Sequence, residues 1–198
     1  MAGHLTHMTG PYYKDYVGIY GYGSLLKDAG AKIEPRIIHR MAMPSPWPIE
    51  YARRSGLWGG GPTLVIHPVG GAVHGQVLVL DAVGRELDYI RQCLREREGN
   101  PPDAGIREMK LAGLDHVLYC DLEPTLAPSE ISPENLAGFA MASVRLRPDK
   151  NGVRYLRQNI EANIITPLTY AYQEEILRRS GANDLLEAEE VLQRGDAR

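Results

Sequence analysis

The stretch that decides the fold is YVGIYGYGSLL, residues 16–26. Its first half, Tyr16–Gly21, is rich in β-branched and aromatic residues bounded by turn formers, which predicts a strand. Its second half is predicted to be a tight turn, in which glycines let a ligand approach the main chain and successive N–H groups can bind an anion. The glycines do not complete a nucleotide-binding GxGxxG motif, because the third position is Leu26, and no P-loop Lys-Ser/Thr follows. On the glycines alone, a strand exit without a ligand is the favoured interpretation.

The rest of the chain places strands first and helices last, with one helix inserted among the strands. Further strands are predicted at 36–43, 49–53, 63–67, 72–80, 108–112 and 116–122. Helices are predicted at 85–98, 133–144, 153–164, 167–179 and 184–192. Ser132 and Thr166 are the expected N-caps of two of these helices, since each precedes a proline suited to the first helical position. This order is typical of the α+β class, and strand 72–80, apolar on both faces, is expected in the centre of the sheet.

The length of 198 residues suits one domain with a small appendage. We expect a loose leader at 1–13, a domain at 14–130, and a helical extension at 131–198 that packs on the domain or on a partner, including a second copy of the chain. The net charge of -3 and the pI of about 6.1 argue against a nucleic-acid binder. No apolar run approaches the ~18–20 residues of a membrane span, and the leader lacks the features of a secretory signal, so the cytoplasm is the expected compartment.

The sequence offers no pattern typical of a metal site. Cys93 and Cys120 do not belong to a CxxC motif. His67 and His74 lie seven residues apart across a predicted turn, but no third ligand has a suitable spacing. We therefore expect no metal ion.

One residue of helix 85–98 breaks the helical pattern. At ~100° per residue, Glu98 falls on the same face as the apolar Leu94, whereas Glu96 falls on the opposite face. Gly99 is suited to the position that follows a helix end. The negative end of the helix dipole and partial burial both disfavour an ionised carboxylate, which brings proton exchange toward the pH range of acid–base catalysis.

A structural interpretation of Glu98 stands beside the catalytic one. Helix ends fray, so that a terminal side chain on the inner face can still reach water. Alternatively, Arg95 or Arg97 pairs with the Glu98 carboxylate and satisfies its charge.

A strand ending in Tyr22-Gly23-Ser24, followed later by an amphipathic helix ending at Glu98, resembles the gamma-glutamylcyclotransferase-like family. The family's Tyr-Gly-Ser signature after its first strand is similar to the first of these motifs. Its catalytic glutamate, just after a Leu-x-x-(Arg/Gln) stretch, is similar to the second. The resemblance covers roughly residues 17–122. The chain differs at Leu25, where many members have Asn or Ile, and in its extended tail.

The resemblance implies a small mixed β-barrel flanked by helices, with an additional C-terminal helical segment, and a cofactor-free reaction. In that reaction the α-amine of a γ-glutamyl group attacks its own γ-carbonyl, which forms 5-oxoproline and expels an amine or amino acid. The main chain of Tyr22, Gly23, Ser24 and Leu25 would bind the glutamyl oxygens, and Glu98 would act as general base and acid. The sequence leaves the leaving group open.

Two other functions are compatible with the same residues. The first is a non-catalytic module that binds a γ-glutamyl or other carboxylated metabolite at the glycine turn. The second is a structural or interaction domain that assembles through its helical tail, for which no pocket near Glu98 is expected.

Overall fold

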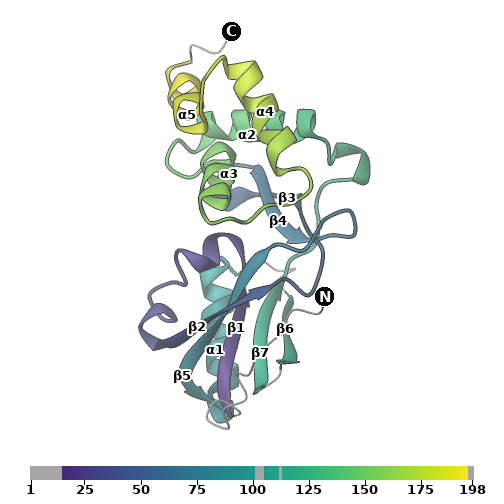
Figure 1. Cartoon of the computed structure of the whole chain (residues 1–198). Coiled ribbons are helices and arrows are strands. Elements are labelled where there is room, and N and C mark those ends of the chain that lie inside the picture. Colours follow the sequence, from purple (N-terminus) through teal and green to yellow (C-terminus); the bar gives the residue numbers. More distant parts are fainter. Residues whose placement is uncertain (1–14, 101–104, 112, 196–198) are drawn as a thin grey trace.

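The computed structural model describes residues 15–100, 105–111 and 113–195, and Figure 1 shows them arranged as two lobes. The leader predicted at 1–13 and the end of the strand predicted at Ala112 lie outside the described residues. We call the lower part of Figure 1 the sheet lobe and the upper part the helical lobe.

The sheet lobe is a five-stranded sheet with one helix on it. Its strands are β1 (Tyr16–Gly21), β2 (Ile37–Pro44), β5 (His74–Val83), β6 (Gly105–Leu111) and β7 (Leu114–Asp121). They are ordered β2-β5-β1-β7-β6, with β1 and β7 parallel and the other pairs antiparallel. The strand predicted to be central, β5, lies between β2 and β1.

Helix α1 (Leu87–Arg97) covers one face of this sheet. Its inner face buries Ile90, Cys93 and Leu94 against apolar side chains of β1 and β5, among them Ile19 and Leu78. This packing is the amphipathic pattern predicted from the sequence, and it fixes the direction in which the end of α1 points.

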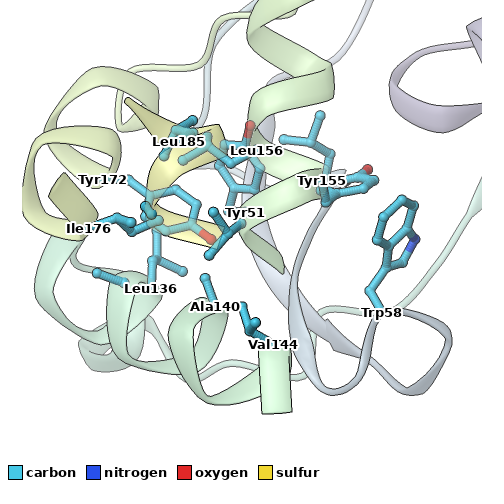
Figure 2. Close-up of a cluster of buried hydrophobic side chains, with 14 of the residues drawn as sticks. Tyr51, Trp58, Leu136, Ala140, Val144, Tyr155, Leu156, Tyr172, Ile176 and Leu185 are labelled. Atoms are coloured by element: carbon cyan, nitrogen blue, oxygen red, sulfur yellow. Dashed lines mark hydrogen bonds between the residues drawn. The ribbon is translucent and has the colours of Figure 1, made fainter. Parts of the chain in front are cut away.

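The helical lobe combines a hairpin from the middle of the chain with all of the C-terminal helices. The hairpin consists of β3 (Ile49–Ser55) and β4 (Gly61–Ile66). The helices are α2 (Pro133–Leu146), α3 (Gly152–Glu161), α4 (Thr169–Ser180) and α5 (Leu185–Arg194). Figure 2 shows their common core, in which Tyr51 of β3 packs among side chains of the helices. The hairpin and the helical tail thus share one core. The domain boundaries at residues 13/14 and 130/131 are predictions from the sequence.

Two glycines let the hairpin and α3 approach each other closely. A Cβ atom added to Gly61 would lie 2.6 Å from the Cα of Gly152, and one added to Gly152 would lie 3.1 Å from the Cα of Gly61. Side chains at either position would force the backbone of β4 away from the helices.

The α+β class is confirmed, whereas the barrel is not. The hydrogen-bonded strands of the described residues form an open sheet and a separate hairpin, with no closed barrel. Within the same residues, no helix combines the length and the apolar composition needed to cross a membrane.

One of the two predicted caps is confirmed and the other is wrong. Ser132 caps α2 by accepting a hydrogen bond from the N–H of Asn135 at 3.3 Å. Helix α4 instead begins at Thr169, and the Thr166 hydroxyl donates to the buried Glu50 carboxylate at 2.6 Å. The Thr166 hydroxyl, which the local pattern assigned to a helix cap, therefore binds a buried carboxylate on a distant strand.

Candidate active site

The end of α1 fixes the position of Glu98. The N–H of Gly99 donates to the carbonyl of Glu96 and the N–H of Asn100 to the carbonyl of Arg95, both at 3.0 Å. With Gly99 in the left-handed region at φ 83°, these bonds form a Schellman motif. Glu98 is the C-cap residue, and its side chain is only 16% exposed.

The Glu98 carboxylate is paired with the residue next to it. Arg97 Nη1 donates to Glu98 Oε1 at 2.6 Å, and the Arg97 side chain is 14% exposed. This is one of the two pairings considered from the sequence. The guanidinium therefore holds the Glu98 carboxylate in place at the end of α1.

The glycine turn follows β1 as a single short helical turn, η1 (Gly23–Leu26). The N–H groups of Lys27 and Asp28 donate to the carbonyl of Ser24 and close the turn. Gly23 has φ 65°, and a Cβ atom there would lie 2.9 Å from the hydroxyl oxygen of Tyr155. A glycine is needed at this position for both reasons, its backbone conformation and its contact with α3.

A cavity of about 810 Å³ joins these two features. Four of the five predicted site residues line it, namely Tyr22, Ser24, Leu25 and Glu98, whereas Gly23 is buried behind the lining. The opposite wall comes from the helical lobe and includes Trp58 and Tyr155. The rings of these two residues lie side by side in Figure 2, with their centroids 4.7 Å apart.

The other titratable groups in the wall are tyrosines, a thiol, two exposed acids and the cationic side chains of Lys27, Arg53, Arg97, Lys150 and Arg154. Burial raises the pKa of Tyr22 well above its ordinary value and that of Tyr155 to about 12. Burial, with the charge of Glu98 as the next cause, also raises the pKa of the Cys120 thiol. These three groups stay neutral near pH 7. Because the remaining lining carboxylates, Asp28 and Asp149, belong to exposed residues, Glu98 is the sheltered carboxylate of the cavity.

Sequence reasoning missed the aromatic wall. Trp58 follows β3 and Tyr155 lies on α3, and no local pattern links them to the turn that they face. Their positions follow from the packing of the hairpin on the tail helices, a long-range contact that the periodicity of either segment does not encode.

The described residues hold no group of three or more His, Cys, Asp and Glu side chains suited to a metal ion. His67, one of the two histidines considered above, serves a local turn, in which its Nδ1 accepts a hydrogen bond from the N–H of Val69 at 3.4 Å.

No family model matches the sequence, and no curated protein matches it. Among solved structures, the chain is similar to a gamma-glutamyl cyclotransferase specific to glutathione from yeast, with 13% sequence identity and a TM-score of 0.43. The similarity spans 91% of this chain and 97% of the yeast chain.

Proposed function

We propose that this chain cyclises a γ-glutamyl compound and releases 5-oxoproline, with Glu98 as general base and acid. The observation that carries the proposal is that the glycine turn and the sheltered Glu98 carboxylate line one and the same cavity. A purely structural role for these residues predicts no such cavity.

The chemistry needs only a proton carrier and a fixed substrate conformation. The α-nitrogen of the substrate forms a bond to its own γ-carbonyl carbon, and the bond from that carbon to the leaving nitrogen breaks. The α-nitrogen loses two protons as the α-ammonium group becomes the lactam N–H. The leaving amide nitrogen gains two protons as it becomes the ammonium group of the expelled amine, so that a single carboxylate can carry the protons between them one at a time. The nucleophile and the electrophile belong to one molecule, so the main task of the protein is to hold them in contact. The reaction involves no oxidation or reduction, and the proposal includes no cofactor.

The residues of the cavity divide these tasks. Glu98, paired through Oε1 with Arg97, accepts the protons of the α-nitrogen in turn and returns them to the leaving nitrogen. The first N–H groups of a helical turn lack partners within the turn, so the main chain at Tyr22–Leu25 is suited to bind the glutamyl carboxylate and carbonyl oxygens. Tyr155 and Trp58 close the opposite side and limit the access of water to the reacting atoms.

A second candidate function is supported by the Arg97–Glu98 pair. A carboxylate held at 2.6 Å by a guanidinium can serve as a fixed binding group for an ammonium without exchanging protons. On this alternative the chain binds a γ-glutamyl metabolite and does not convert it.

The experiment is a turnover assay of the full chain against glutathione, a γ-glutamyl amino acid and a γ-glutamylamine, with 5-oxoproline measured by mass spectrometry. The matched control for each compound carries an acetyl group on the α-nitrogen, which removes the nucleophile and keeps the rest. Release of 5-oxoproline from a free compound and none from its acetylated form supports the enzyme. Saturable binding of the panel without product supports the binding module, and neither binding nor product overturns both.

A further inference from the structure

We infer that Arg97 is a positioning residue that couples the Glu98 carboxylate to the glycine turn, so that the proton carrier and the substrate-binding main chain keep one geometry. The inference rests on the proposed function of the cavity and adds a residue to it.

The guanidinium of Arg97 contacts both halves of the site at once. Its Nη1 donates to Glu98 Oε1 at 2.6 Å, and its Nη2 donates to Ser24 Oγ at 3.1 Å and to the carbonyl of Asp28 at 2.7 Å. Nε donates to the same carbonyl at 3.1 Å. The catalytic end of α1 and the turn after β1 are about 70 residues apart in sequence, and one planar side chain bridges them.

The surroundings are shaped to hold this side chain. A Cβ atom added to Gly30 would lie 3.0 Å from Cγ of Arg97, and Gly30 has φ 87°. The absence of a side chain there leaves room for the aliphatic stem of Arg97. Three donor nitrogens in a fixed plane serve three acceptors, a geometry that the single ammonium of a lysine cannot reproduce.

The pairing of Arg97 with Glu98 lies at the very end of α1. Glu98 is the C-cap residue, and its N–H still donates to the carbonyl of Leu94 at 3.0 Å, so its side chain keeps to the face of Leu94 while Arg97 reaches it from the adjacent position. Because Arg97 binds Oε1, the orientation of the carboxylate is set, and Oε2 is the oxygen offered to the substrate. Without the guanidinium, Glu98 can rotate and the turn loses a cross-link.

Another arginine of the same helix provides a matched control. Arg91 points to the sheet edge, where it donates to the carbonyl of Ile106 at 2.6 Å and to Glu108 at 3.3 Å. It does not line the cavity. Replacing Arg91 removes the same charge and the same side-chain volume from α1 and leaves the site intact.

The experiment compares Arg97→Ala, Arg97→Lys and Arg91→Ala with the wild type in two measurements. In the turnover assay, Arg97→Ala is expected to lower kcat by about 100-fold, since misplacing a reacting group by about 1 Å has that effect. KM is expected to change much less. Added guanidinium at non-denaturing concentrations restores part of kcat to Arg97→Ala and none to Arg91→Ala, and Arg97→Lys stays impaired. Unchanged kcat in Arg97→Ala, or a loss that guanidinium does not rescue, overturns the inference.

The second measurement does not require turnover. Amide hydrogen exchange of the folded protein is expected to quicken at residues 24–30 in Arg97→Ala and to stay unchanged there in Arg91→Ala. If the wild type converts no γ-glutamyl compound, the proposed function fails while exchange still decides whether Arg97 couples the two segments. Equal exchange in the two alanine variants overturns the coupling, whatever the activity.

Discussion

The sheet lobe and the helical lobe bring different chemistry to the cavity between them. The sheet lobe contributes the carboxylate of Glu98, the guanidinium of Arg97 and the turn at Ser24. The helical lobe contributes the aromatic rings of Trp58 and Tyr155, with Lys150 Nζ 5.3 Å from the centroid of the Trp58 ring. On the proposed function, the sheet lobe would carry the proton transfer and the helical lobe would shape the space for the substrate. Substitutions in the two lobes should therefore affect different quantities.

The largest effect on stability is expected in the core of the helical lobe. Leu156 of α3 is fully buried among the side chains shown in Figure 2. Leu156→Ala should lower the free energy of unfolding by about 2–5 kcal/mol, the cost of lost burial and of the cavity left behind. Chemical denaturation followed by circular dichroism measures it.

Leu94→Ala makes the matching change in the sheet lobe, where Leu94 is also fully buried. Similar losses of unfolding free energy in Leu156→Ala and Leu94→Ala would show that each lobe has a well-packed core. A loss below about 1 kcal/mol for Leu156→Ala would break the comparison, because it would mean that the tail helices are not part of the folded core.

Local patterns predicted the helix end but not what surrounds it. The phase of α1 placed Glu98 on the face of Leu94, and Gly99 marked the end, because both depend on neighbours in sequence. The turn after β1 was predicted for the same reason. The contacts of Arg97 with Ser24 and Asp28 depend on how β1 and α1 pack, which no periodicity encodes.

The long-range pairings account for the remaining differences. The sequence predicts strands at 49–53 and 63–67, and the structure pairs them in a separate hairpin that packs on the tail helices. Thr166 was expected to cap a helix, and its hydroxyl is used by Glu50 instead. For Thr166, a tertiary contact overrides the local preference.

A smaller effect, on the KM for the substrate, is expected from a substitution in the helical lobe. Trp58→Ala removes an aromatic wall of the cavity, and we expect KM for the best γ-glutamyl substrate to rise by about tenfold while kcat changes little. Steady-state kinetics measures both. A loss in kcat alone would assign Trp58 to the chemical step and contradict the comparison.

The pH dependence of stability is predicted from one fully buried carboxylate in the helical lobe, Glu50. It accepts hydrogen bonds from the Thr166 hydroxyl and the N–H of Tyr51, at 2.6 and 2.9 Å. Burial raises the pKa of Glu50. Above the ordinary range of a carboxyl group, the native state then binds more protons than the unfolded state, so the free energy of unfolding falls as pH rises through the raised pKa.

Glu50→Gln should remove this contribution, which is at most about 1.4 kcal/mol per pH unit, because the amide does not titrate and its oxygen can accept the same bonds. Denaturation curves between about pH 4 and pH 7 give the slope for both proteins. Identical slopes would mean that Glu50 titrates as it does in the unfolded chain.

The smallest effect is expected at the surface ion pair between the lobes. Lys27 lies just after η1, and its ammonium is 3.1 Å from the carboxylate of Glu161 on α3, with both side chains nearly half exposed. Lys27→Met should lower the free energy of unfolding by about 0.2–1 kcal/mol at low salt, and less at high salt. A larger loss would show that this pair, and not the packing around Tyr155, holds the lobes together.

The most direct test of the account compares two glutamates at the end of one helix. Glu98 lines the cavity, whereas Glu96 lies on the outer face and pairs with Lys32 at 2.6 Å. With the best substrate of the panel, Glu98→Gln is expected to lower the kcat for 5-oxoproline release by about 10²–10⁴-fold, the usual contribution of a general acid–base group, and Glu96→Gln to keep the wild-type rate. Wild-type turnover in Glu98→Gln would contradict the account.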